Sequence, residues 1–134
     1  MRLLVDTSVW SLALRRDAAP HSPEVDALRD ALEGGDLVFT TGLVLQELLQ
    51  GFHGPRAKQR IVDDFAAIPV VVPDRMDHVE AAGLRNACRR RGIEVGTIDA
   101  LLAQLCLRHD LTLMTTDADF QHMRRVCQLA LWRG

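Results

Sequence analysis

Several residue types are scarce in this chain, and each shortage narrows the classes of protein to which it can belong. There is no tyrosine, and aromatic residues make up only 4% of 134 positions, so a platform for stacking nucleic-acid bases is not expected. The five histidines are scattered, and the three cysteines show no CxxC spacing, which argues against a zinc site and a disulfide framework. We expect Cys88, Cys106 and Cys127 to be buried free thiols.

Long apolar runs are also missing. None would span a bilayer, and Asp6 interrupts the apolar start where a signal peptide would continue. We therefore expect a cytoplasmic protein without membrane association. The length predicts one domain, residues 1–134, with the 48% apolar and 25% charged residues of an ordinary globular protein.

Short β-type runs alternate with longer helical patterns, which predicts an α/β domain around a mostly parallel central sheet. Strands are predicted at 2–5, 37–40, 70–72, 111–114 and 127–131. Helices are predicted at about 8–14, 23–34, 42–51, 55–67, 75–92, 97–109 and 117–125. Caps support several of these starts, among them Ser22 before Pro23, and Asp74.

Four acidic residues lie in apolar sequence: Asp6, Glu47, Asp99 and Asp117. Asp6 and Asp117 follow predicted strands, where ligand sites of α/β sheets form. Asp99 lies in a first helical turn, and Glu47 interrupts an apolar helix face. Carboxylates that converge against a core repel one another unless a cation joins them, and a hard divalent ion suits their oxygens. The pattern indicates a metal-dependent phosphodiesterase.

Hydroxyl residues beside these acids could orient their carboxylates, namely Thr7, Ser8, Thr115 and Thr116. Each aspartate taken alone could instead be a helix cap or a first-turn acid, worth about 1 kcal/mol. Glu47 does not fit that alternative, because no cap requires an acid in the middle of a helix.

The segments Val5–Trp10 and Thr115–Phe120, with Glu47 on a leucine-rich helix and Asp99 at a helix start, resemble the PIN-domain ribonucleases. Length and motif order resemble in particular the VapC-type toxins of type II toxin–antitoxin modules. The resemblance implies a three-layer α/β/α PIN-like domain with a mostly parallel sheet. It also implies an endoribonuclease that uses Mg²⁺ or Mn²⁺ to cut RNA, often tRNA or rRNA, and that forms a homodimer and binds a small antitoxin protein.

The same resemblance implies catalytic roles for Asp6, Glu47, Asp99 and Asp117. Asp6 and Asp99 would bind the metal directly, and Asp117 would do so directly or through water. Glu47 would hold a second metal or polarise water, and Thr115 matches the small hydroxyl residue of the family. Asp119 would either join the site or cap the last helix, and capping is the preferred interpretation.

Arginine is the prevailing base, since Lys58 is the only lysine. Arg15 and Arg85 are the better candidate contacts to RNA phosphates. Arg89–Arg91 are candidates too, but compensation of the dipole of the predicted helix in whose last turn they lie is the favoured interpretation of them. The net charge of −2 neither requires nor excludes RNA. Without the four acids, 16 basic residues stand against 14 acidic ones, a balance of +2.

Two alternatives remain. A non-catalytic RNA- or protein-binding module could keep the PIN fold, but it would be expected to have lost at least one of the acids. An aspartate-based phosphotransfer domain also places acids beyond parallel strands. It would require a late lysine near the phosphate and, in hydrolases of that type, a second acid where Ser8 stands.

Overall fold

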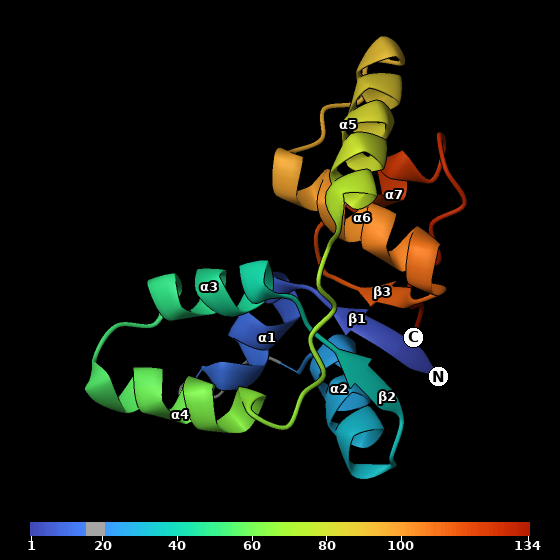
Figure 1. The fold of residues 1–134 in the computed structure, drawn as a ribbon. Helices are drawn as coiled ribbons and strands as arrows, with labels where there is room; N and C mark the ends of the chain where they lie inside the picture. Colours follow the sequence, from blue (N-terminus) through green and yellow to red (C-terminus); the bar gives the residue numbers. More distant parts are fainter. Residues whose placement is uncertain (16–20) are drawn as a thin grey trace.

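The computed structural model describes residues 1–15 and 21–134 and contains a parallel three-stranded sheet among helices (Figure 1). The strands are β1 (Arg2–Val5), β2 (Leu37–Phe39) and β3 (Thr112–Met114), in the order β2-β1-β3. The helices are α1 (Thr7–Leu14), α2 (Pro23–Glu33), α3 (Gly42–Gly51), α4 (Pro55–Phe65), α5 (Arg75–Arg90), α6 (Thr97–His109) and α7 (Asp119–Met123). The prediction of an α/β fold with a parallel sheet is confirmed.

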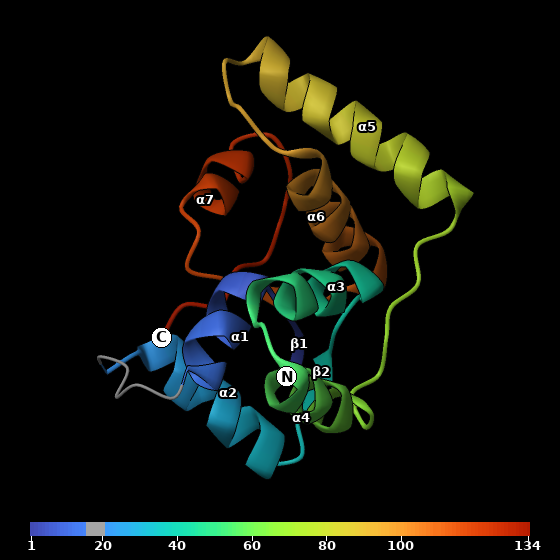
Figure 2. The same ribbon diagram turned by 90° about the vertical axis from the view of Figure 1, so that its left-hand side faces the viewer.

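Helices cover the sheet from both sides. Figure 1 shows α5, α6 and α7 above the strands and α2 below them, while α1, α3 and α4 lie beyond one end. After a quarter turn, Figure 2 shows α5 as the outermost helix, with α6 between it and the rest of the molecule. The central position of α6 explains its composition, because Leu102, Ala103 and Leu105 are all fully buried.

Local sequence signals account for the helix starts. The Ser22 side chain accepts a hydrogen bond from the Val25 amide, and Pro23 occupies the first helical position of α2. Asp74 and Asp77 form a reciprocal capping box at the start of α5. These signals depend on neighbours in sequence, so they could be predicted without knowledge of the fold.

The strands predicted at 70–72 and 127–131 are present only as isolated bridges. Val70 pairs only with Thr40, at the outer edge of the sheet, where Val70 and Val72 are 51% and 73% exposed. Pro69 and Pro73 flank this segment, and proline cannot donate to a ladder. At the opposite edge, Leu131 pairs only with Leu113 of β3.

Trp10 and the three cysteines lie within or beside the hydrophobic core. Trp10 is 5% exposed and packs against Phe65 with 4.7 Å between ring centroids, so it belongs to the core. Cys88 and Cys106 are buried free thiols as predicted, and Cys127 is a partly buried one. Within the described part of the chain, no helix combines the length and the apolarity needed to cross a membrane.

Candidate active site

The parallel register of β1 and β3 brings two distant segments together at one edge of the sheet. Val5 lies beside Met114, and the Asp6 amide continues the ladder by donating to the Met114 carbonyl oxygen over 2.9 Å. The residues that follow the two strands, Asp6 after β1 and Thr115 after β3, therefore lie side by side. This is the carboxyl edge of the sheet, where the sequence predicts a ligand site.

The Asp6 carboxylate is held by three donors and is only 8% exposed. Its Oδ1 accepts from the Thr7 amide at 2.8 Å, as the cap of α1. Its Oδ2 accepts from the hydroxyls of Ser8 at 3.0 Å and Thr115 at 2.8 Å. Hydrogen bonds of this kind fix the orientation of a carboxylate.

The other hydroxyl residues join this network unequally. The Thr115 hydroxyl accepts from the Asp117 amide at 3.0 Å, so a single side chain links Asp6 to Asp117. Thr116 contributes its amide, which donates to the Ser8 hydroxyl at 3.1 Å, while its exposed side chain has no recorded bond to an acid. The predicted orienting role of Thr116 is therefore seen for its backbone only.

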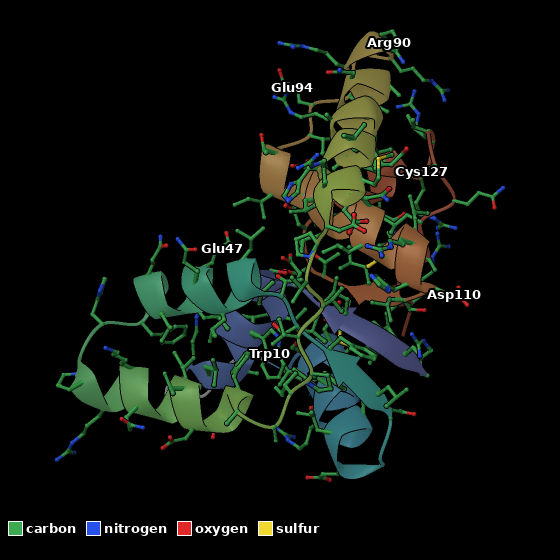
Figure 3. All side chains as sticks on the ribbon, viewed as in Figure 1. Trp10, Glu47, Arg90, Glu94, Asp110 and Cys127 are labelled. Carbon is green, nitrogen blue, oxygen red and sulfur yellow. The ribbon has the colours of Figure 1, made fainter. Side chains whose placement is uncertain are left out.

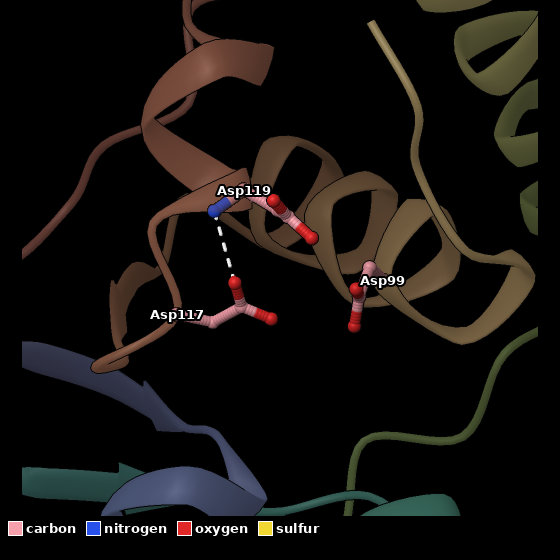
Figure 4. A group of neighbouring side chains, drawn as sticks. All are labelled: Asp99, Asp117 and Asp119. Carbon is pink, nitrogen blue, oxygen red and sulfur yellow. Dashed lines mark hydrogen bonds between the residues drawn. The ribbon is translucent and has the colours of Figure 1, made fainter.

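Three aspartates form a compact group at this edge (Figure 4). Asp99, Asp117 and Asp119 each offer a carboxylate oxygen, and these atoms all lie within 4.8 Å of one another. Asp99 comes from the first turn of α6, and Asp119 from the first turn of α7. The Asp119 amide donates to the Asp117 carboxylate at 2.9 Å.

The preferred interpretation of Asp119 as a cap is wrong. The cap position of α7 is Ala118, and no side chain caps this helix. Asp117 accepts the Asp119 amide instead, which leaves the Asp119 carboxylate free to face Asp99. The position of Asp119 two residues after Asp117, beyond a strand, could have indicated that it joins the acid cluster. The same spacing also fits a residue that caps the next helix.

Glu47 reaches the site from α3. Figure 3 labels it on the side of α3 that faces α5 and α6. Its Oε1 accepts from the Thr7 hydroxyl at 2.9 Å, which ties α3 to the start of α1. Thr41 sets the position of α3 by capping it through the Val44 amide at 3.1 Å. Glu47 and Asp6 both lie outside the group of three, although their charges act on it.

The charges of these acids converge on Asp99. Burial is the largest cause that raises its pKa, and the charges of Asp6, Asp117, Asp119 and Glu47 add to it, so that the pKa of Asp99 reaches about 6. In residues 1–15 and 21–134, no basic group forms an ion pair with any of these five acids. The site therefore carries a negative charge that the described residues leave uncompensated.

A divalent metal fits this donor set. All the candidate ligands are carboxylate oxygens, which Mg²⁺ and Mn²⁺ prefer. The 4.8 Å group supplies three of them, and the oriented Asp6 lies close enough to be the largest charge contribution to the Asp99 pKa. A cation there would relieve the repulsion that raises this pKa.

The two candidate phosphate contacts lie in different places. Arg15 follows α1, about 12 Å along the helix axis from Thr7 at 1.5 Å per residue. There it lines a cavity of about 560 Å³ with Phe52 and Arg56. Arg85 lines a cavity that includes Asp119, so it borders the acid cluster. The structure thus brings Arg85 to the site and not Arg15, and a role in binding RNA stays a prediction for both.

Comparisons with known proteins agree with this geometry. The family model of the PIN domain matches residues 3–126. Ribonuclease VapC11 of Mycobacterium tuberculosis is 30% identical over 131 residues, which cover 95% of each chain. Several solved structures share the fold, and two of them serve as examples. VapBC2 from Rickettsia felis, bound to a DNA fragment from its promoter, has a TM-score of 0.77 at 19% identity and covers 99% of this chain and 100% of that one.

The second is VapBC-5 from Mycobacterium tuberculosis, a member of the VapBC family of toxin–antitoxin systems. It has a TM-score of 0.70 at 19% identity, and all of both chains is covered. The match to the family model starts within β1 and covers β2, β3 and all the acids described above. The chain belongs to the PIN-domain family and, within it, to the VapC group.

Proposed function

We propose that this chain is the toxin of a type II toxin–antitoxin module and that it hydrolyses RNA phosphodiester bonds with Mg²⁺ or Mn²⁺. The observation that carries the proposal is the convergence of five carboxylates from four separate segments at one sheet edge, without a basic partner among the described residues. The similarity to VapC11, a ribonuclease, supports RNA as the substrate.

Asp99 and Asp117 would hold the metal together with Asp119, and Asp6 would complete the ligand set from the end of the neighbouring strand β1. Asp6 is suited to this because three donors already fix its carboxylate, so little freedom is lost when it binds. When bound, the metal neutralises charge on the attacked phosphate and lowers the pKa of water.

Glu47 would act on the water molecule at the phosphate, and the protonation state of Asp99 would affect metal binding. The Thr7 hydroxyl occupies one oxygen of Glu47, so the other can accept a proton from, or orient, a water molecule at the phosphate. Asp99 has a pKa of about 6 without a cation, so some of it carries a proton near neutral pH. That proton must leave before the carboxylate can act as a ligand.

An antitoxin partner is supported by the VapBC structures to which this chain is similar. A small protein of this kind would keep the nuclease inactive until it is released. Formation of a homodimer stays a prediction, and so does the RNA target within the tRNA and rRNA classes.

The two alternatives are less well supported. Lys58, the only lysine, lies exposed on α4, and it forms no recorded contact with any acid of the cluster, as a phosphotransfer domain would require. An uncompensated acid cluster is not expected in a non-catalytic module, because repulsion between the acids lowers the stability of the fold.

Mapping of RNA ends tests the proposed function. Purified protein is incubated with cellular RNA with Mn²⁺, with Mg²⁺ or with a chelator, and the new 5′ ends are sequenced. We expect cuts at a small number of positions that require the metal and are absent with Asp99→Asn. Cleavage that survives chelation, or that persists with Asp99→Asn, would contradict the proposed mechanism.

A further inference from the structure

A second cavity shares a wall with the acid cluster. It has a volume of about 430 Å³ and is lined by residues from the end of α5, the turn into α6 and the start of α7: Arg85, Arg89, Ile93, Glu94, Val95, Gly96 and Asp119. Asp119 thus belongs to both the cavity and the metal-capable group. Anything bound in the cavity lies next to the atoms that would hold the metal.

Two arginines of α5 face into this cavity together, since Arg85 and Arg89 are four residues apart and lie on one side of the helix. The Arg85 Nε donates to the Val95 carbonyl oxygen at 2.8 Å, which fixes the plane of its guanidinium group. Its terminal nitrogens keep their N–H groups for a ligand. Neither arginine forms an ion pair with a described residue.

The neighbouring residues indicate the sign of the ligand. Glu94 and Asp119 also line the cavity, so their two negative charges balance those of the two arginines as long as Asp119 binds no metal. Under the proposed function Asp119 shares its charge with a metal, and the cavity then carries a net positive charge. A fixed guanidinium plane and a second arginine suit the oxygens of a phosphodiester.

We infer that this cavity binds an RNA phosphate next to the one that is cut, with Arg85 and Arg89 as substrate-binding residues. The inference rests on the proposed function and adds a position for the substrate strand to it. The strand would pass from the acid cluster across Asp119 towards the end of α5. The volume falls in the range of ligand sites, so a nucleotide unit can enter with its phosphate.

Arg89 and Arg90 provide a matched pair for a test. Both are exposed residues in the last turn of α5, so both compensate the helix dipole, but only Arg89 lines the cavity. Figure 3 shows Arg90 at the end of α5. Steady-state cleavage is measured on a single-stranded oligoribonucleotide that carries the mapped cleavage site, with parent, Arg89→Gln and Arg90→Gln.

We expect Arg89→Gln to raise KM about tenfold, as loss of a charged hydrogen bond does, while kcat changes little. The slope of log(kcat/KM) against log salt should become shallower by about 0.7, the value for one phosphate contact to a single strand. Arg90→Gln should change neither quantity. Arg85→Lys keeps the charge but loses the planar fork, and it should also raise KM without lowering the melting temperature.

Neutral phosphates locate the contact. Methylphosphonates replace the phosphates that flank the scissile bond, one at a time, in the same oligoribonucleotide. At one flanking position the replacement should raise KM for the parent, and it should raise KM by a smaller factor for Arg89→Gln, because only the contact of Arg85 is then left to lose.

Equal effects of Arg89→Gln and Arg90→Gln would overturn the inference, as would additive effects at every flanking phosphate. If Arg85→Lys lowers the melting temperature, the comparison of Arg89→Gln with Arg90→Gln decides the outcome by itself. These results leave the proposed function intact when the parent still cuts RNA with metal. A parent that cuts no RNA overturns the proposed function and, with it, this assignment of the ligand.

Discussion

Two aspartates on neighbouring helices show how differently one fold treats a buried negative charge. Asp77 on α5 is 1% exposed, and Asp99 on α6 is half-buried. Burial raises the pKa of both side chains. For Asp77, hydrogen bonds from the Asp74 amide, Gln104 and Arg108, with the charge of Arg108, outweigh burial and hold the pKa below its usual value. For Asp99, every neighbouring charge adds to the effect of burial.

The difference separates a structural acid from a candidate functional one. Arg108 on α6 pairs with Asp77 and also lies 3.1 Å from Asp74, so this cation joins the two helices and gives both acids a partner inside the chain. The acids around Asp99 have no such partner among the described residues. A charge that the chain leaves unbalanced in this way indicates a partner from outside, which is what a metal site requires.

The largest expected effect separates activity from stability at Asp99. Asp99→Asn should lower RNA cleavage about a thousandfold, because a metal ligand that supports several kcal/mol of charge stabilisation is lost. The melting temperature without metal should stay the same or rise, since one of five repelling charges has gone. Cleavage rates and thermal melts of both proteins check this. A variant that melts well below the parent yet still cuts RNA would mean that Asp99 is a structural residue.

Metal binding should raise the stability of the parent alone. A ligand that binds only the folded state adds about 2.7 kcal/mol at a hundredfold excess over its Kd. We expect Mn²⁺ to raise the melting temperature of the parent in a concentration-dependent way and to leave Asp99→Asn nearly unchanged. Na⁺ at matched ionic strength is the control. The same shift in both proteins would place the metal elsewhere.

The contrast between the two aspartates also shows what the sequence can predict. Asp6 and Asp117 could be predicted as site residues because parallel strands end at a common edge, so that local strand patterns imply a long-range meeting point. Asp99 and Glu47 required the further argument that four acids in apolar sequence must be compensated together. The helix starts followed from caps such as Ser22, whose partners lie within three residues.

Features that depend on distant partners could not be predicted. The ion pair of Asp77 joins residues 31 positions apart, and nothing near Asp77 in sequence distinguishes it from an ordinary capping acid. Asp119 was ambiguous for a related reason, since capping and metal binding require the same residue type at the same spacing. The prediction of full strands at 70–72 and 127–131 was wrong, because the number of residues of an edge segment that pair depends on a strand distant in sequence.

At Asp77 the expected effects are the reverse of those at Asp99. Asp77→Asn should lower the free energy of unfolding by about 2 kcal/mol, less than for a fully buried pair because Arg108 keeps Asp74 and is 42% exposed. Cleavage by the folded protein should not change. Urea unfolding measures the loss, and Asp64→Asn is the control, since its pair with Arg60 is exposed and should change stability by less than about 1 kcal/mol. Equal losses would remove the distinction between the two pairs.

The pH dependence of stability gives the smallest expected effect. The pKa of Asp99 rises from 3.8 to about 6 on folding, so between these values the folded state keeps a proton that the unfolded state has lost. Stability without metal should therefore fall as pH rises from about 4 to about 6 and then stay lower, by about 1 kcal/mol after screening by solvent. Urea unfolding of the parent and Asp99→Asn across this range isolates the contribution. The stability of Asp99→Asn minus that of the parent should grow with pH, and an excess of Mn²⁺ should reverse its sign by stabilising the parent. A difference that is constant with pH would mean that Asp99 keeps its usual pKa.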